Sequence, residues 1–220
     1  MEKEFWLERW EREEIGFHEG EVNAYLPQFW HDLDVEKDAT VFVPLCGKSL
    51  DLKWLREQGH SVLGVELSNI AVQAFFDENA YAPIHSKRNK FDCCEADDIC
   101  ILCGDFFELN HSDMAGVRAV YDRASMIALP PEMRKRYVQH LVNILPRGVP
   151  ILLVTIDYLQ EQMPGPPFAL GHEEVVSLFA EYASIKMLAE HDVLEQNLRF
   201  KKRGLTGMQE RVYLLTLLAS

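Results

Sequence analysis

The chain has 220 residues, of which 48% are hydrophobic and 26% charged, and its 35 acidic against 22 basic side chains give a formal net charge of −13. This composition is typical of a globular protein, and the length suits one large α/β domain, which we predict to span residues 1–220. The acidic excess repels nucleic-acid phosphates and anionic membrane surfaces, so the sequence predicts neither as a partner and favours a small-molecule ligand.

Membrane and secretory segments are not expected. No stretch approaches the roughly 18 consecutive apolar residues that a membrane span requires, and the acidic start MEKEFWLERWEREE lacks the apolar core of a secretory signal. We also expect a monomer, because no surplus apolar stripe indicates an obligate partner.

The five cysteines, which are Cys46, Cys93, Cys94, Cys100 and Cys103, form an odd set clustered mainly in one region. This pattern favours free thiols in a reducing, cytoplasmic setting over a disulfide framework. Cys100 and Cys103 have the spacing of a redox pair or a zinc site, but residues three apart in a strand point to opposite faces. We therefore expect buried structural thiols and no metal site.

In chain order, strand-like runs alternate with helical segments. An amphipathic helix is expected over residues 4–14, where Trp6 and Trp10 lie one turn apart. Strands are then expected at residues 40–45, 60–67, 99–109, 117–121, 149–158, 184–193 and 211–219, and further helices at 51–58, 69–79, 132–145 and 172–182. Residues 81–98 are polar and look irregular. The alternation predicts a three-layer α/β fold with a mostly parallel sheet, in which the last two strands pair antiparallel.

The segment TVFVPLCGKSLDLKWL, residues 40–55, contains Gly47, Lys48 and Ser49 after its apolar strand, and these three residues match the end of a phosphate-binding loop. That loop also requires glycine where Phe42 stands, and a phenylalanine side chain would obstruct the backbone nest around a triphosphate. The three spaced glycines that let a backbone approach a pyrophosphate are also missing. The sequence therefore argues against both a nucleotide triphosphatase and a dinucleotide site.

Glu66 ends the second predicted strand, where an acidic side chain accepts both hydroxyls of a ribose in dinucleotide-binding folds. A ribose site without a pyrophosphate site predicts a nucleoside cofactor that carries no phosphate, of which S-adenosylmethionine is the common one. The alternative is a solvated glutamate at a strand end.

Two further strand ends supply polar groups. Asp105 is placed to accept from an adenine amino group and Phe106 to cover the ring, although aspartate beside glycine is also ordinary turn chemistry. Asp122 and Arg123 end the next strand and are predicted as catalytic residues, Arg123 by holding a cofactor carboxylate or an anionic nucleophile. A structural ion pair is the alternative for Arg123. Open α/β sheets bind ligands at this carboxyl edge.

With S-adenosylmethionine as cofactor, the methyl donor is already activated, so the protein would supply alignment and exclusion of water more than acid–base chemistry. The eight histidines show neither triad nor metal-ligand spacing, and His18 is expected at the surface. Trp10 on the N-terminal helix is a candidate to close over the cofactor as a lid, the alternative being simple packing on the sheet.

Several segments, in order and over nearly the whole chain, resemble the thiopurine S-methyltransferase family in its bacterial form. They are FWLERW and GFHEG, VFVPLCGKSLDLKWL with GHSVLGVELS, YDRASMIALPPEMR, PGPPF and RVYLLT. The resemblance implies a seven-stranded Rossmann-like methyltransferase fold, S-adenosylmethionine as methyl donor with S-adenosylhomocysteine as product, and thiopurines and related small aromatic or heterocyclic thiols as acceptors.

The resemblance also implies roles for the residues at matched positions. The positions at which the family contacts its cofactor correspond to Trp10, Leu45, Glu66 and Arg123. The stretch that contacts adenine corresponds to Asp105 and Phe106. The positions that border the acceptor correspond to Phe17, Pro167 and Arg199. This chain departs from the family at two places: Tyr121 stands where the mammalian form has tryptophan, and residues 200–207 are basic and unlike the corresponding family segment. The identity of the methyl acceptor is therefore left open. Selenium and tellurium compounds, halide or thiocyanate are alternative acceptors, and a nucleoside-binding protein without catalysis or an NAD-dependent enzyme are alternative functions.

Overall fold

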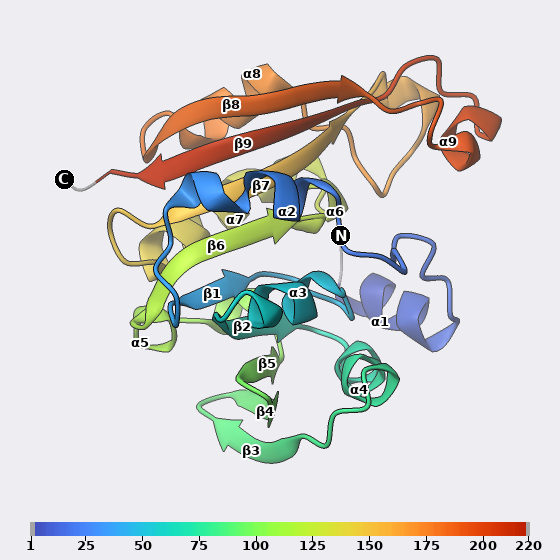
Figure 1. Ribbon diagram of the computed structural model, residues 1–220. Coiled ribbons are helices and arrows are strands. Elements are labelled where there is room, and N and C mark those ends of the chain that lie inside the picture. Colours follow the sequence, from blue (N-terminus) through green and yellow to red (C-terminus); the bar gives the residue numbers. More distant parts are fainter. Residues whose placement is uncertain (1–2, 219–220) are drawn as a thin grey trace.

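Five parallel strands form the centre of the sheet in the computed structural model, which describes residues 3–218 (Figure 1). In spatial order they are β5 (Ile99–Cys103), β2 (Ser61–Glu66), β1 (Thr40–Val43), β6 (Val117–Arg123) and β7 (Pro150–Asp157). Most of their residues are buried because helices cover both faces, which explains why these strands appear in the sequence as apolar runs.

The last two strands, β8 (Ala183–Asp192) and β9 (Gln209–Leu217), complete one side of the sheet. β9 lies between β7 and β8 and runs antiparallel to both. The antiparallel pairing expected for the last two strands is therefore confirmed, although the segment between them contains a short helix over residues 198–202 that the sequence did not predict. Residues 1, 2, 219 and 220 of the predicted domain, including the predicted end of this strand at residue 219, lie outside the described residues.

The sheet has nine strands, not the seven expected, because residues 81–98 are not irregular. They contain a hairpin of β3 (Ile84–Arg88) and β4 (Phe91–Ala96), and β4 pairs antiparallel with β5 (Figure 1). All five residues of β3 are exposed, so this edge strand carries no apolar alternation that would identify it. The strand expected over 99–109 also ends early, at Cys103.

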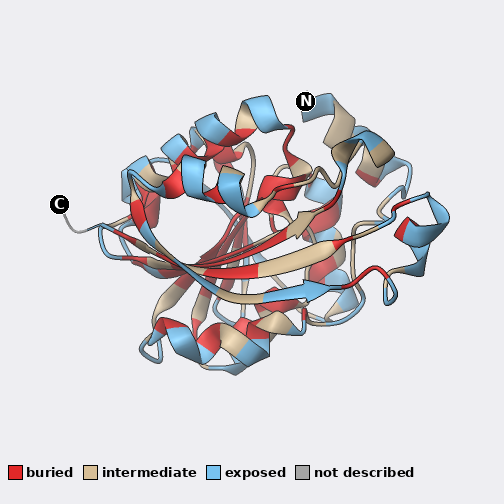
Figure 2. Cartoon of the chain, turned by 90° about the horizontal axis from the view of Figure 1, so that it is seen from above, coloured by how far each residue is buried: buried red, intermediate tan, exposed pale blue. Residues whose placement is uncertain are grey.

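Helices form the two outer layers, and Figure 2 shows their exposed outer surfaces around a buried interior. Side chains of α5 (His111–Met114), α6 (Ser125–Ala128), α7 (Pro131–Ile144) and α8 (His172–Phe179) pack in the core on one face. Side chains of α2 (Tyr25–Phe29), α3 (Asp51–Glu57) and α4 (Asn69–Glu78) pack on the other, with the 3₁₀ helix η1 (Trp30–Leu33). Two further 3₁₀ turns are η2 (Phe106–Glu108) and η3 (Gln160–Gln162).

Two helices lie off the layers, at the edge toward which the parallel strands point. They are α1 (Lys3–Glu11), three residues shorter at its end than expected, and α9 (Leu198–Lys202) (Figure 1). Trp10 is the buried residue of α1. Within residues 3–218, no helix combines the length and apolar character that crossing a membrane requires.

Gly64 lets the loop after β1 approach β2. A Cβ atom at this position would lie 2.8 Å from Cys46 Sγ and 3.4 Å from Ile101 Cγ1. We predict that Gly64→Ala lowers the free energy of unfolding by about 1–3 kcal/mol, the usual cost of overpacking. Urea denaturation measures this, with Gly20→Ala as control, because a Cβ on Gly20 meets nothing within 4 Å. Adding Cys46→Ala should restore part of the loss, and equal midpoints for the two glycine variants would contradict the packing argument.

Candidate functional site

A cavity of about 930 Å³ lies at the carboxyl ends of the parallel strands, a volume within the range of small-molecule sites. Its walls come from the segments that follow β1, β2, β5, β6 and β7, and from the N-terminal segment and α9. The structure therefore brings together most of the residues selected from the sequence. Those that line the cavity are Trp10, Phe17, Leu45, Glu66, Asp105, Phe106, Arg123, Pro167 and Arg199.

The loop after β1 turns sharply below this cavity. Leu45 has φ +45° and Gly47 has φ +53°, and a non-glycine residue in this region costs on the order of 1 kcal/mol or more. The Cys46 amide donates to the Val65 carbonyl at 3.0 Å, which ties the loop to β2. An added Cβ on Gly47 would lie 3.4 Å from Trp10 Cζ2, so the indole packs directly on the loop backbone.

Glu66 is fixed by two backbone amides. Gly47 N donates to Oε2 at 2.9 Å and Ser68 N donates to Oε1 at 2.8 Å, and the residue is 7% exposed. Burial raises the pKa of Glu66, while these amide bonds act in the opposite direction. A carboxylate offers about four lone-pair sites, so the backbone amides of Gly47, Ser68 and Leu67 leave acceptor capacity on this group.

Lys48 is among the residues that line the cavity, but its ammonium group is engaged in an ion pair and is not free to bind a phosphate. Its Nζ lies 2.6 Å from Glu78 Oε1 at the end of α4, and its side chain is mostly buried. This ion pair agrees with the sequence argument against a nucleotide triphosphatase.

The segment after β5 differs in detail from expectation. Asp105 caps η2 by accepting from Phe107 N at 3.0 Å, and its other oxygen pairs with Lys3 Nζ at 2.7 Å. The Phe106 ring is 2% exposed and stacks on Tyr137 at 4.7 Å, so it presents little surface to a ligand. Phe107, which the sequence reasoning did not select, is only partly buried and lines the cavity. The sequence shows both phenylalanines, but it does not show the 3₁₀ turn that determines which of the two rings faces the cavity.

At the end of β6, neighbouring residues point in opposite directions. Arg123 lines the cavity and forms an ion pair with Glu19 of the N-terminal segment. Asp122 is buried behind the wall and accepts from the Tyr137 hydroxyl at 2.6 Å. Among the described residues, Asp122 is not part of the lining, so any catalytic role for it must act through a neighbour and stays a prediction.

The predicted acceptor residues Phe17, Pro167 and Arg199 all line the cavity. The Phe17 ring packs edge-on against Trp6 at 5.5 Å and Trp10 at 5.6 Å. Arg199 of α9 donates to the Gly16 carbonyl, which joins the basic segment to the N-terminal one. Pro167 follows a cis peptide bond, and its carbonyl accepts from Tyr158 Oη at 2.6 Å.

Several charged or titratable residues of the wall were missed. Glu19, Asp51 and Glu210 line the cavity, and burial raises the pKa of Glu210. His18, expected at the surface, is half-buried in the lining, and burial followed by the charge of Lys48 lowers its pKa. The only signal for Glu210 was an acidic residue at the start of an apolar strand, which is too common to identify a site.

Residues 1–217 match the model of the family described as thiopurine S-methyltransferase. A thiopurine S-methyltransferase from Nitrosospira multiformis is 55% identical over 215 residues, which are 98% of each chain. Another from Pseudomonas fluorescens is 51% identical over 97% of this chain and 98% of the relative. The chain belongs to the thiopurine S-methyltransferase family. It is therefore an S-adenosylmethionine-dependent methyltransferase, which confirms the enzyme class and cofactor predicted from the sequence.

Solved structures place the fold of this family member among methyltransferases. An S-adenosylmethionine-dependent methyltransferase from Anabaena variabilis has a TM-score of 0.66 at 14% identity, covering 98% of this chain and 94% of its own. One from Methanosarcina mazei has a TM-score of 0.65 at 12% identity, covering 87% and 98%. The likeness concerns the fold, and it confirms the Rossmann-like α/β class.

The buried Asp122 makes the stability of this methyltransferase depend on pH. Burial raises the pKa of Asp122 from 3.8 to about 6. Between these values the folded protein holds the proton more tightly than the unfolded chain, so the free energy of unfolding falls as pH rises from about 4 to about 6, by roughly 3 kcal/mol from this group.

We predict that Asp122→Asn removes this decline, because an amide oxygen still accepts from Tyr137 while no charge develops in the interior. Urea denaturation at pH 4, 5, 6 and 7 measures it, with the exposed Asp77→Asn as the control that keeps the wild-type slope. A variant slope equal to that of wild type would show that Asp122 is not the group responsible.

Proposed function

We propose that this chain transfers the methyl group of S-adenosylmethionine to the sulfur of thiopurines and related small aromatic or heterocyclic thiols. The observation that supports this most is the buried Glu66 carboxylate, which lines the cavity and keeps unused acceptor capacity beside a turn that lacks the spaced glycines of a diphosphate site. The relatives that carry this name over nearly the whole chain give the acceptor class.

The wall residues fit the cofactor in three parts. Glu66 would accept the two ribose hydroxyls, and Leu45 with Trp10 would flank the nucleoside. Asp105 and Phe106 belong to the stretch that would contact adenine. One carboxylate oxygen of Asp105 forms an ion pair with Lys3 Nζ. Arg123 would bind the amino-acid carboxylate or an anionic acceptor.

The cofactor supplies a methyl group already activated by its sulfonium. In the proposed step the acceptor sulfur forms a bond to the methyl carbon while the carbon–sulfur bond of the donor breaks, which yields S-adenosylhomocysteine and a thioether. An acidic thiol loses its proton to solvent before this step. The protein residues therefore align the two sulfurs and exclude water, and no dedicated base is required.

Phe17, Pro167 and Arg199 would form the acceptor end of the cavity. The first two give apolar surfaces suited to a flat heterocycle, and the Arg199 guanidinium attracts the thiolate. Three segments distant in sequence supply this end, and the contact between Arg199 and the Gly16 carbonyl joins two of them.

The N-terminal helix is proposed as a lid. Four contacts hold it and its following segment over the cavity: Lys3 with Asp105, Trp10 on Gly47, Arg199 with Gly16, and Glu19 with Arg123. Glu19 occupies the guanidinium that an anionic ligand would use, so ligand and segment compete for Arg123. Limited proteolysis of residues 11–20 tests this, since S-adenosylhomocysteine should change the cleavage rate and an unchanged rate would contradict a lid.

We further propose that the enzyme acts as a monomer in a reducing cytoplasm. The five cysteines are free thiols, as the sequence predicted, and an acidic surface disfavours self-association. Light scattering tests the first part, and a stable dimer at micromolar concentration would overturn it.

Glu66→Gln should weaken binding of S-adenosylhomocysteine by about 1–3 kcal/mol, because an amide cannot accept both hydroxyls and both backbone amides with the same charge-assisted strength. Isothermal titration calorimetry measures the affinity, and the melting temperature of the free protein shows whether the loop itself is damaged. The exposed Glu57→Gln is the matched control. Unchanged affinity would remove Glu66 from the proposed cofactor site.

The acceptor is tested by a screen with labelled S-adenosylmethionine. We expect a higher kcat/KM for a thiopurine than for iodide, thiocyanate or selenite, because the cavity wall combines the apolar surfaces of Phe17 and Pro167 with the Arg199 guanidinium. Higher turnover on the inorganic ions would overturn the thiol assignment while leaving the cofactor assignment intact. Binding of NAD without S-adenosylhomocysteine would contradict both.

A further inference from the structure

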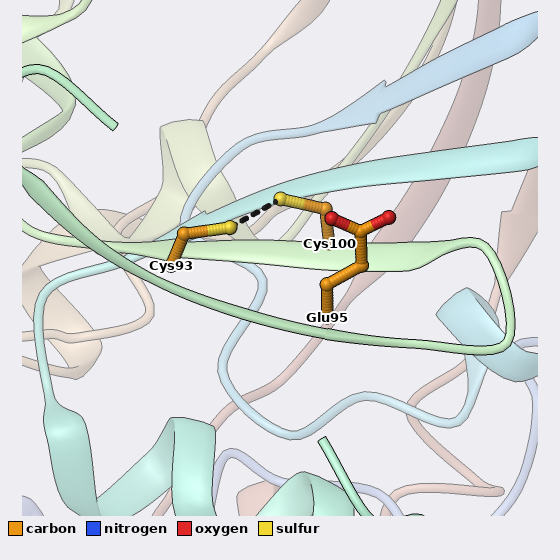
Figure 3. Close-up of side chains that lie close together, drawn as sticks. All are labelled: Cys93, Glu95 and Cys100. Carbon is orange, nitrogen blue, oxygen red and sulfur yellow. Dashed lines mark hydrogen bonds between the residues drawn. The ribbon is translucent and has the colours of Figure 1, made fainter. Parts of the chain in front are cut away.

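A second cluster of metal-ligating side chains lies outside the methyltransferase cavity. It consists of Cys93, Glu95 and Cys100, whose ligand atoms all lie within 4.8 Å of one another (Figure 3). Cys100 and Cys103 have the spacing of a redox pair or a zinc site, but they pack against opposite faces of the sheet, as predicted from that spacing. The actual partner of Cys100 is Cys93 on the neighbouring strand, with the sulfurs 2.9 Å apart.

The ladder between β4 and β5 places the three side chains on one face. Cys93 and Glu95 are two residues apart on β4 and so point the same way, and Glu95 lies directly opposite Cys100 on β5. Cys93 is buried, Cys100 is half-buried and Glu95 is exposed, so the cluster runs from the core to the surface.

The register argues against a disulfide as the resting form. Cys93 lies opposite Leu102, so Cys93 and Cys100 are diagonal neighbours in the ladder. Diagonal neighbours have Cα atoms about 7–8 Å apart, whereas a disulfide requires about 4.4–6.8 Å. Two sulfurs held close on such a frame are better suited to share a bound ion than to bond to each other.

The donor set suits a thiophilic divalent cation. Two thiolates and a carboxylate are common zinc ligands, and a tetrahedral ion with bonds of about 2.3 Å places two sulfurs roughly 3.8 Å apart. Small side-chain rotations open the present 2.9 Å separation to that distance. The exposed side of the cluster leaves the fourth position to water.

A second cavity gives access to this cluster. It has a volume of about 230 Å³, and Glu95, Cys100 and Arg88 are among the residues that line it. It also includes Thr40 and Ser61, the first residues of β1 and β2, so it lies at the opposite edge of the sheet from the methyltransferase cavity.

We propose that Cys93, Cys100 and Glu95 form a binding site for one zinc-class divalent cation that joins β4 to β5, separate from the methyltransferase site. A dithiolate with a carboxylate carries three negative charges, of which a divalent ion neutralises two, and Arg88, which also lies 3.9 Å from Asp113, lines the same cavity. The bound ion would fasten the hairpin of β3 and β4, which is attached to the rest of the sheet through the pairing of β4 with β5.

The test uses the full-length protein, reduced and stripped with a chelator, and titrated with Cd²⁺ while thiolate-to-metal charge-transfer absorption is followed. We expect one equivalent to saturate the signal, and Cys93→Ser and Cys100→Ser each to weaken binding at least tenfold. Cys103→Ser is the matched control on the same strand but the opposite face, and it should bind as wild type does. Glu95→Gln, an exposed change that leaves both thiols in place, should weaken binding severalfold.

A second measurement guards against variants that fold poorly. Buffered Zn²⁺ should raise the melting temperature of the wild type and the Cys103→Ser variant, but not that of the Cys93→Ser/Cys100→Ser double variant. Reduced wild-type protein that binds no Cd²⁺, or a double variant that keeps the full stoichiometry, would overturn the proposal. Neither measurement uses methyl transfer, so the result is independent of the proposed acceptor.

Discussion

The bonds from the Gly47 and Ser68 amides to the Glu66 carboxylate hold the cofactor edge of this sheet together. They join the turn after β1 to the turn after β2, the two strands at the centre of the fold. A buried carboxylate is costly unless its oxygens are bonded, and the amides lower that cost without using every lone pair. The hydrogen bonds that stabilise the two turns thus leave the Glu66 carboxylate able to accept further hydrogen bonds from a ligand in the cavity.

The N-terminal segment completes the site from outside the sheet. Trp10 rests on Gly47, Lys3 pairs with Asp105 and Glu19 pairs with Arg123, so one short segment contacts three strand-end turns. Two of these contacts are ion pairs, whereas Trp10 is buried against the loop. We propose that this segment opens and closes as a lid over the strand ends.

Local pattern was sufficient to predict the parallel core and the strand-end residues, because buried strands are continuous apolar runs and polar residues at their ends are conspicuous. Glu66, Arg123 and Leu45 line the cavity as expected. The hairpin of β3 and β4 was missed because an exposed edge strand has no apolar period to detect.

Properties that depend on pairing between distant segments were beyond the sequence. The burial of Phe106 follows from its stacking on Tyr137, and the proximity of Cys93 to Cys100 follows from strand register. The roles of Glu19 and Glu210 likewise arise from folding, which places two ordinary acidic residues beside Arg123. The resemblance of whole segments to a known family identified the chemistry, whereas these contacts required the structure.

The most direct test of the account compares the affinities of S-adenosylhomocysteine and its 2′-deoxy analogue in wild type and in the Glu66→Gln variant. If the Glu66 carboxylate accepts both ribose hydroxyls, the wild type should lose roughly tenfold or more in affinity for the deoxy compound, and the variant should discriminate far less. Equal affinities of the wild type for the two compounds would contradict the central claim.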